Sequence, residues 1–443
     1  MRVHQIAARL RTLLGEEGDF ATVLRGAGLV VIIRVLASAI GFASVILLAR
    51  WMGSAQYGIY SFAIAWMVLL AYPATLGLHG AAVRLVAQYA AADDWQHVVG
   101  FMKVSSWLAF GCGALAATLA VGAVLLFKSH LDPAYVEPTI VALAGIPIVA
   151  LTIVRSESIR GLGWLALAWG PYQLGQPLFL LIVTAIILAV AMQLTATMAV
   201  GASIVAYAAS LIAQWGIVHG RLGTRSSVEH RIQLGPWLGV AVSFFWISLA
   251  NMTLLQAGVI VVGIFLKPHD VAIYSAAAAT SGLAALPTYA AVALGAPKFA
   301  ALHAQHRKPE LQALFTNIVR LTFWPSLAIA VIFVASGSLV LRLFGPGFEQ
   351  GYPVLLILTI GQLVIAFLGP VANLLNMTGH HVSTARVQTT AAILGVLLGL
   401  VFTRIGGTVG TAVAFSAAMA LGNACLTIFV VRKLEIYPSL PRR

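Results

Sequence analysis

The chain has 443 residues, of which 60% are hydrophobic and only 9% are charged, and its formal net charge is +13. Soluble domains carry about 25% charged residues, so this composition excludes a water-soluble globular protein. Apolar stretches long enough to cross a bilayer recur along the whole chain, which predicts an all-α polytopic membrane protein. The two cysteines, Cys112 and Cys425, lie in separate apolar segments and predict neither a disulfide framework nor a metal site.

Residues 1–25 precede the first long apolar run and are predicted to stay in the cytoplasm. The stretch MRVHQIAARLRTLL fits either a short amphipathic helix on the membrane surface or a disordered tail. It does not fit a cleavable signal peptide, because the apolar run that begins near Gly26 is too long for the apolar region of one.

Apolar windows of about 20 residues predict membrane-spanning helices along the chain. There are twelve, over residues 26–48, 58–80, 101–127, 137–154, 170–192, 195–218, 237–265, 271–294, 318–343, 353–376, 386–404 and 407–431. Taken in sixes, they give an N-terminal bundle over residues 26–218 and a C-terminal bundle over residues 237–431, around a central cavity. Residues 219–236 are then a cytoplasmic linker, and residues 432–443 are a cytoplasmic tail.

The distribution of Lys and Arg over the predicted loops gives the orientation. With the N-terminus in the cytoplasm, twenty of these residues fall on the inner side, and five fall on the outer side: Arg50, Lys128, Lys267, Arg342 and Arg404. Cytoplasmic loops of membrane proteins carry the excess of positive charge, so both termini are predicted to be cytoplasmic. This placement explains the basic balance of the chain, and no nucleic-acid partner is expected.

The two predicted bundles are related by an internal repeat. The stretch that starts at Val45 aligns without a gap to the stretch that starts at Val259, an offset of 214 residues. Ile-Tyr-Ser at 59–61 meets Ile-Tyr-Ser at 273–275, Pro73 meets Pro287, and Arg84 meets Lys298. Six helices return the chain to the same side of the membrane, so the repeats are predicted to be parallel, which is an architecture of transporters.

Arg34 lies in the middle of the first predicted span, in the stretch GAGLVVIIRVLASAIG. A charge at a helix centre costs about 2.5–3.5 kcal/mol on insertion scales, so such residues usually face a bundle interior or a watery cavity. Small residues such as Ala37 and Gly41 share the helix face of Arg34, whereas Leu36 lies on the opposite face. We therefore expect Arg34 to point inward, either to bind an anionic group or to bond to neighbouring helices.

The sequence offers five further candidate substrate-binding residues. Arg84 and Lys298 are the aligned basic pair at the inner ends of the second and eighth spans, where membrane anchoring is the competing explanation. Ser248 occupies the repeat position of Arg34, and Asn251 and Gln256 follow it on the seventh span, where bonds between helices are the competing explanation. His79 is alone in its span and is expected to serve packing or capping.

The interiors of the predicted spans hold no acidic residue, because Glu137 is the first residue of the fourth span and the other twelve Asp and Glu residues fall in loops or tails. This favours an anionic over a cationic substrate. No Walker-type glycine loop, paired carboxylates or histidine metal cluster appears in the sequence, so no cofactor is expected and catalysis is disfavoured.

Several stretches resemble a known family of transporters. LLARWMGSAQYGIYSFA, with its Tyr57–Tyr60 pattern, looks like the junction of the first two helices in polysaccharide flippases. LGLHGAAVRLVAQYA, with Gly77 and Arg84, resembles the end of their second helix, and VAIYSAAAA, Pro297 and LFGPGFEQGYPVLLIL are similar in the second half. The whole chain fits the twelve-helix plan of the multidrug/oligosaccharidyl-lipid/polysaccharide exporter superfamily, and most resembles its lipopolysaccharide and O-antigen flippases.

The resemblance implies a substrate, a location and partners. The substrate would be an undecaprenyl-diphosphate-linked oligosaccharide, a unit of O-antigen, capsule or exopolysaccharide, flipped from the cytoplasmic to the periplasmic leaflet of the bacterial inner membrane. The implied partners are membrane lipids, a polysaccharide polymerase and chain-length machinery. Two alternatives stay open: a drug or small-metabolite exporter of the same fold, and a membrane polysaccharide polymerase or ligase, which would be expected to have longer outer loops.

Overall fold

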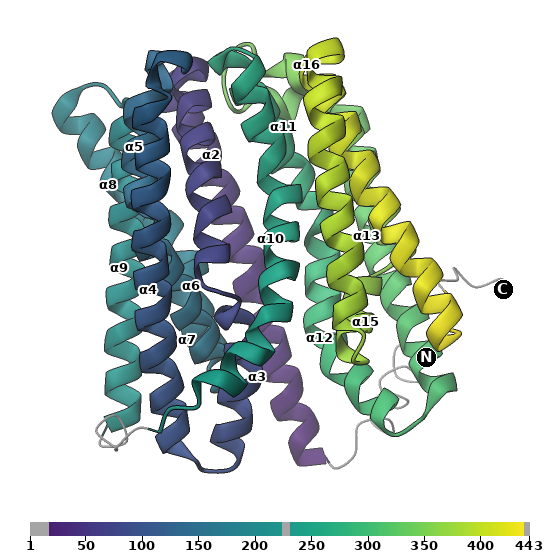
Figure 1. Cartoon of the computed structure of the whole chain (residues 1–443). Helices are drawn as coiled ribbons and strands as arrows, with labels where there is room; N and C mark the ends of the chain where they lie inside the picture. The colour runs from purple at the N-terminus through teal and green to yellow at the C-terminus, as the bar shows by residue number, and fades with distance from the viewer. Residues whose placement is uncertain (1–16, 224–230, 438–443) are drawn as a thin grey trace.

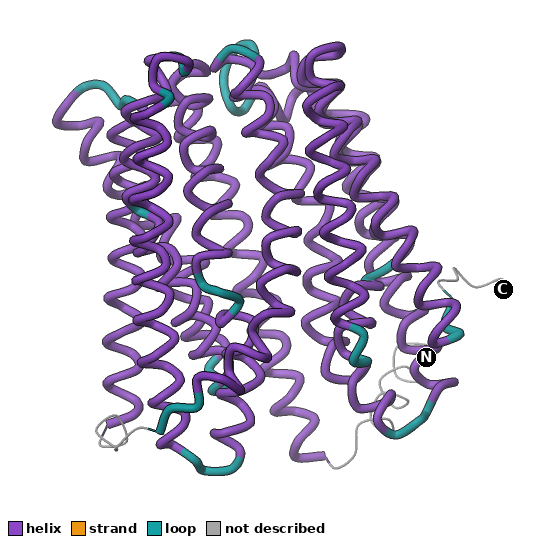
Figure 2. The backbone as a smooth tube through the Cα atoms, in the orientation of Figure 1, coloured by secondary structure: helices purple, strands orange, loops and turns teal. Residues whose placement is uncertain are grey.

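The computed structural model describes residues 17–223 and 231–437, and every element of secondary structure in these two ranges is helical (Figures 1 and 2). The stretch at residues 1–14 that is predicted as an amphipathic helix or a disordered tail lies outside these ranges. The described part contains nine helices long and apolar enough to cross a membrane, or ten if one bent pair is a single span. The chain is thus a multi-pass membrane protein.

The elements follow one another with short connections. The first half contains α2 (Glu17–Ala74), α3 (Leu78–Ala91), α4 (Trp95–Leu126), the 3₁₀ turn η1 (Lys128–His130), α5 (Pro133–Ala144), α6 (Ile146–Gly161), α7 (Leu165–Trp169), the π-helical turn η2 (Gly170–Gly175), α8 (Gln176–Ala191) and α9 (Ala196–Leu222). The second half contains α10 (Leu234–Phe265), α11 (Pro268–Ser281), η4 (Gly282–Ala285), α12 (Leu286–Ala304), α13 (Lys308–Arg342), η5 (Phe348–Gly351), α14 (Tyr352–Leu368), α15 (Val371–Met377) and α16 (His381–Leu434).

Two of these elements are too long to cross a bilayer once. At about 1.5 Å per residue, α2 with 58 residues and α16 with 54 residues would each extend far beyond a hydrocarbon core of about 30 Å. Each is broken at one glycine with non-helical backbone angles, Gly53 (φ 73°, ψ 167°) in α2 and Gly407 (φ 57°, ψ −139°) in α16. Positive φ strains residues that carry a Cβ, whereas glycine adopts it readily. A glycine therefore allows each long element to turn back on itself close to where the sequence predicts a loop.

The contacts within α16 show that it folds back on itself at Gly407. The hydroxyl groups of Thr403 and Thr411 lie 2.6 Å apart, on either side of that glycine. A Cβ added to Gly410 would lie 2.0 Å from the carbonyl oxygen of Phe402, so the two arms approach here at backbone distance. Further along, Gly399 faces Phe415, Gly395 faces Ala418 and Gly422 faces Ala391. These pairs converge on residue 407, as an antiparallel helical hairpin requires.

The fourth predicted span ends too early. The prediction placed it at residues 137–154, whereas the structure forms α5 and α6 with a bend of 42° between them and continues α6 to Gly161. Glu157 therefore lies inside a helix, with its side chain 19% exposed. The prediction that no acidic residue lies in the interior of a span is wrong at this position, because mean hydropathy falls along α6 while Ser156, Ser158 and Ile159 remain buried.

The two halves pack closely at the end of the molecule where α10 gives way to α11 (top of Figure 1). A Cβ on Gly58 of α2 would overlap the carbonyl oxygen of Pro268 at 1.8 Å, and Ser54 Oγ lies 2.9 Å from His269 Nδ1. Arg50 Nε donates a hydrogen bond of 2.6 Å to the carbonyl oxygen of Leu343. We refer to this region as the closed end.

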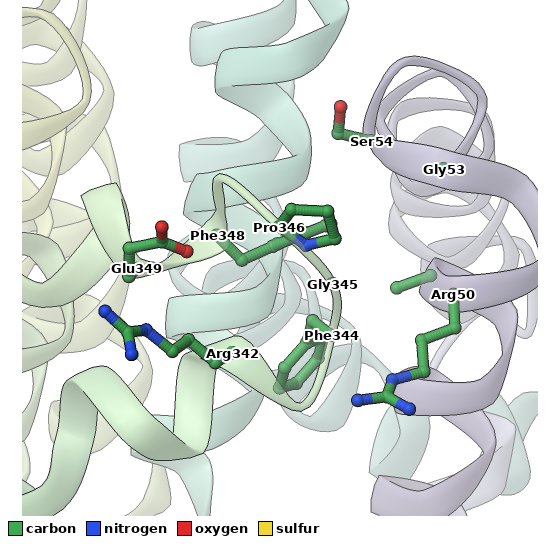
Figure 3. A pocket seen from close by; sticks show the side chains of 10 residues that line it. Arg50, Gly53, Ser54, Arg342, Phe344, Gly345, Pro346, Phe348 and Glu349 are labelled. Atoms are coloured by element: carbon green, nitrogen blue, oxygen red, sulfur yellow. The ribbon is translucent and has the colours of Figure 1, made fainter.

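A cavity of about 680 Å³ lies at the closed end, between α2 and the loop that follows α13 (Figure 3). Residues 49–54 of α2 form one wall, and residues 342–349 form the other. Arg50 and Arg342 contribute the basic groups of its lining, and Glu349 contributes a carboxylate (Figure 3).

Helix α10 connects the halves at the opposite end. Its first turns lean toward α3 and α4 in Figure 1. Trp237 is 1% exposed, stacks edge-to-face on Phe101 of α4 and donates a hydrogen bond of 3.0 Å to the hydroxyl of Tyr89 in α3. Higher on α10, Gly77 at the start of α3 lies against Ala241 and Phe245 so closely that a Cβ would be 2.2 Å from the Ala241 oxygen. The start of α10 is therefore packed into the first half.

We predict that Gly410→Ala destabilises the folded protein, because the added Cβ must push the arms of α16 apart at Phe402. Overpacking of this kind costs about 1–3 kcal/mol, so thermal unfolding in detergent should occur at a clearly lower temperature. Gly406→Ala is the matched control, because no atom lies within 4 Å of a Cβ there. Equal unfolding temperatures for the two variants would contradict the hairpin.

Candidate substrate site

Arg34 of α2 lies between aromatic rings from both halves of the molecule. Its guanidinium carbon is 5.2 Å from the ring centre of Trp169 in α7 and 5.2 Å from the ring centre of Tyr289 in α12. On the same helix, Ala37 is buried while Leu36 is 50% exposed, so Arg34 faces inward as the sequence predicts. Cation–π contacts contribute about 0.5–2 kcal/mol each and offset part of the cost of placing a charge in an apolar bundle.

A second basic group and a carboxylate lie beside Arg34. Arg160 Nη2 is 2.6 Å from Glu157 Oε2, one helical turn away on α6, and the two side chains are 34% and 19% exposed. The charges of both residues act on Arg34. We call Arg34, Glu157, Arg160, Trp169 and Tyr289 the central cluster. Two guanidinium groups against one carboxylate leave it with an excess of positive charge.

Local structure fixes the position of the central cluster. Ser156 Oγ donates a hydrogen bond of 2.9 Å to the carbonyl oxygen of Ala168, so the residues next to Glu157 and Trp169 are tied together. Directly after Trp169 the chain forms the π-helical turn η2, which contains Pro171. Proline cannot donate the backbone hydrogen bond of a regular helix, and π-turns of this kind are frequent at functional sites.

Histidine 79 joins the two halves beside the central cluster. Its Nδ1 lies 2.6 Å from Thr75 Oγ1, its Nε2 lies 2.8 Å from Ser248 Oγ on α10, and its ring packs edge-to-face on Tyr72. Tyr72 in turn interacts with Tyr172 of η2. His79 thus does more than the expected packing or capping, because it bonds across the molecule. Ser248, a predicted substrate residue, is already occupied by this bond.

The other predicted residues are not brought to Arg34 by any contact in the described ranges. Arg84 on α3 and Lys298 on α12 are exposed, and neither has an ion pair or a hydrogen bond among the described residues. Asn251 and Gln256 on α10 are half-buried, and no hydrogen bond to either side chain is found in the same ranges. Their roles stay predictions.

Sequence reasoning missed four members of the central cluster. With the predicted span ending at residue 154, Arg160 falls among the twenty basic residues of the inner side and Glu157 falls in a loop. The i, i+3 spacing of Glu157 and Arg160 was the available signal, since such a pair stabilises a helix. Trp169 directly precedes the fifth predicted span and Tyr289 lies within the eighth, and nothing in the sequence marks either ring as a neighbour of Arg34.

Comparison with known proteins identifies the family. A model of the family described as "Polysaccharide biosynthesis protein" matches residues 23–303, which is well over half of the chain. The chain belongs to this family. A search of curated proteins finds no match.

Solved structures of transporters share the fold. The structure described as the inward-facing conformation of a multidrug resistance MATE family transporter of the MOP superfamily has a TM-score of 0.74 at 15% identity, covering 91% of this chain and 98% of that one. The lipid II flippase MurJ in an inward closed conformation gives 0.67 at 14% identity, covering 91% and 87%. A MOP superfamily transporter from Pyrococcus furiosus, described as having a binding pocket of reverse polarity, gives 0.62 at 15% identity, covering 92% and 95%. The predicted polysaccharide family is thus confirmed by the family match, and these structures show that the chain shares the fold of such transporters.

We predict that Ser248→Ala destabilises the protein, because it leaves His79 Nε2 without its partner on α10. An unpaired buried polar group costs about 1–3 kcal/mol, which thermal unfolding in detergent will detect. Ser243→Ala is the control on the same helix, since no hydrogen bond of the Ser243 side chain is found among the described residues. A Ser248→Ala protein as stable as the control would show that the His79 bond does not hold the halves together.

Proposed function

We propose that the protein flips an undecaprenyl-diphosphate-linked oligosaccharide, a unit of O-antigen, capsule or exopolysaccharide, from the cytoplasmic to the periplasmic leaflet of the bacterial inner membrane by alternating access. The observation that carries this proposal is the central cluster, in which the guanidinium groups of Arg34 and Arg160 lie among membrane helices. Membership in the polysaccharide biosynthesis family supports a carbohydrate-bearing substrate.

A diphosphate matches the chemistry of the central cluster. Guanidinium groups offer fixed pairs of donors to phosphate oxygens and keep their charge in apolar surroundings. An anionic head group that crosses the hydrocarbon needs such compensation, because an isolated charge is poorly tolerated there. Trp169 and Tyr289 add aromatic faces next to the arginine on which sugar rings can pack. Asn251 and Gln256 on α10 would supply hydrogen bonds to sugar hydroxyl groups.

A division into twelve spans, arranged as two parallel repeats of six, would explain where the helices begin and end. Cutting α2 at Gly53 and α16 at Gly407, and joining the second arm of α2 to α3, α5 to α6, α7 to α8, α11 to α12 and α14 to α15, gives two sets of six. The repeat offset of 214 residues carries Gly53 to Lys267, directly before α11, and carries Trp95, the start of α4, to Pro309, one residue into α13. With both termini cytoplasmic, the closed end faces the periplasm.

The two halves meet along two sets of contacts, which we call seams: one contains Arg34 and Tyr289, and the other contains Ser248 and the Thr75–His79 pair. The internal repeat relates the two seams to each other. The offset maps Arg34 onto Ser248 and Thr75 onto Tyr289, so the Arg34–Tyr289 contact corresponds to the contact of Ser248 with the Thr75–His79 pair. The second seam is reinforced by the close approach of Gly77 to α10. We infer that the Arg34 seam is the one that opens for a substrate whose lipid tail must stay in the bilayer.

Arg84 and Lys298 complete the proposal. They are exposed and correspond to each other in the repeat, on α3 and α12. With both termini cytoplasmic, both would lie toward the inner side, where they can attract a diphosphate before it reaches Arg34. Membrane lipids surround the protein, and a polymerase and chain-length machinery would use the flipped product.

One observation favours a second candidate function. Glu157 supplies a carboxylate inside the helical bundle, the kind of group that a transporter of cationic drugs requires. An exporter of drugs or small metabolites with the same fold is therefore a stronger alternative than the sequence alone indicates. The excess of arginine over carboxylate in the central cluster still favours an anion.

We predict that Arg34→Ala abolishes most of the flipping activity. Loss of a charge-assisted hydrogen bond costs about 1.5–3 kcal/mol, so the rate should fall about tenfold or more. The measurement uses liposomes with a fluorescent undecaprenyl-diphosphate oligosaccharide and scores its accessibility in each leaflet. Arg404→Ala is the matched control, because Arg404 also lies over an aromatic ring, Phe265 at 4.7 Å, outside the central cluster.

The outcomes of this experiment distinguish an error in the role of Arg34 from an error in the proposed function. Flipping that survives Arg34→Ala would keep the function and reduce Arg34 to helix packing. A well-folded wild type that flips nothing, with or without an ion gradient or a membrane potential, would favour the exporter.

We predict that residues 137 and 305 lie on opposite sides of the membrane. In a protein with Cys112 and Cys425 replaced by alanine, Glu137→Cys should react with a membrane-impermeant maleimide in intact cells whose outer membrane has been permeabilised. Gln305→Cys should react only after the inner membrane is opened as well. Both positions are exposed, so access is decided by the membrane. The reverse pattern would overturn the orientation inferred from the positive charges.

A further inference from the structure

Glu157 is a carboxylate in a place proposed to receive a diphosphate. Of the charged groups that act on Arg34, two come from α6: Arg160, which repels it, and Glu157, which attracts it. A carboxylate next to an incoming anion weakens binding, so a site built only for affinity would not contain one. The position of Glu157 therefore requires a separate explanation.

A bound diphosphate would change the balance of positive and negative charge in the central cluster. Glu157 Oε2 lies 2.6 Å from Arg160 Nη2, and its charge also acts on Arg34, so one carboxylate compensates two guanidinium groups. Without Glu157, the two guanidinium groups of the central cluster would lose their one carboxylate partner within it. Uncompensated buried charges are strongly unfavourable.

The backbone under Glu157 cannot move aside easily. Ser156 is bonded to the Ala168 carbonyl oxygen, and a Cβ on Gly161 would lie 2.9 Å from the carbonyl oxygen of Ala82 in α3. The end of α6 is thus fixed against α7 and α3. Any exchange of partners must then occur by rotation of the Glu157, Arg160 and Arg34 side chains.

We propose that Glu157 is an internal counter-ion that occupies the arginine site when the transporter is empty and is displaced from the two arginines by the diphosphate of the substrate. This inference rests on the proposed function and adds a determinant of specificity to it. A ligand must offer the arginines more than one carboxylate does, so a diphosphate competes successfully and a monophosphate competes poorly. The empty site, being compensated by Glu157, can reorient without a bound anion.

Binding to the purified protein tests the competition directly. The probes are farnesyl diphosphate and farnesyl monophosphate, which share one prenyl chain and differ in the number of phosphate groups. Glu157→Gln should bind both more tightly, by about tenfold, which is within the usual range of coupling between sites. The preference for the diphosphate over the monophosphate should shrink. Glu137→Gln, an exposed carboxylate of α5, is the control and should bind as the wild type does.

A second variant covers the case in which Glu157→Gln does not fold. Glu157→Asp keeps the charge on a shorter side chain, which weakens the contact with Arg160, so binding should tighten in the same direction but less. Unchanged or weaker diphosphate binding by a folded Glu157 variant overturns the inference while leaving the proposed function intact. A wild type that binds neither probe overturns the proposed function, and this inference with it.

Transport provides a readout that a purely structural role would not give. In liposomes, Glu157→Gln should retain exchange of labelled for unlabelled lipid-linked oligosaccharide, because both half-reactions then occur with substrate bound. Net flipping should fall several-fold, because the empty site must return with two uncompensated arginines. Equal loss of exchange and of net flipping would overturn the role of Glu157 in the return step.

Discussion

The need to compensate Arg34 inside a membrane protein organises the centre of this structure. A guanidinium group cannot be neutralised by losing a proton in this setting, so the surrounding helices must provide electron-rich partners. They do so from three directions, with the Trp169 ring from α7, the Tyr289 ring from α12 and the Glu157 carboxylate from α6. These partners come from both halves of the chain, and the same charge therefore lies where the halves meet.

The two seams between the halves differ in the strength of their contacts. At one, His79 bonds to Ser248 and Gly77 lies at backbone distance from α10, which gives a tight and largely uncharged contact. At the other, the Arg34–Tyr289 contact joins a flexible charged side chain to a ring. Close packing resists small separations, whereas a long side chain can follow a moving partner. In the proposed function, this asymmetry would let the Arg34 seam open toward the bilayer while the other seam stays closed.

Some features followed from the sequence because they depend on local properties. Hydropathy predicted apolar segments where the structure forms helices, and the 3.6-residue period placed Arg34 on the small-residue face. The first predicted outer loop, by contrast, is the single reversal at Gly53. The end of α6 was also misplaced, since a window average cannot distinguish a polar helix end that stays buried from a loop. That one error removed Glu157 and Arg160 from the predicted site.

The sequence by itself determined the class of protein, the family and the presence of one inward-facing arginine, because composition, periodicity and short motifs are properties of the chain. Only the tertiary structure decided the partners of that arginine. Glu157, Trp169 and Tyr289 are separated from Arg34 by more than 100 residues each, and in so apolar a sequence many aromatic residues are equivalent until helices are packed. The bond between His79 and Ser248 was equally hidden, since it joins two helices whose contact depends on the glycines between them.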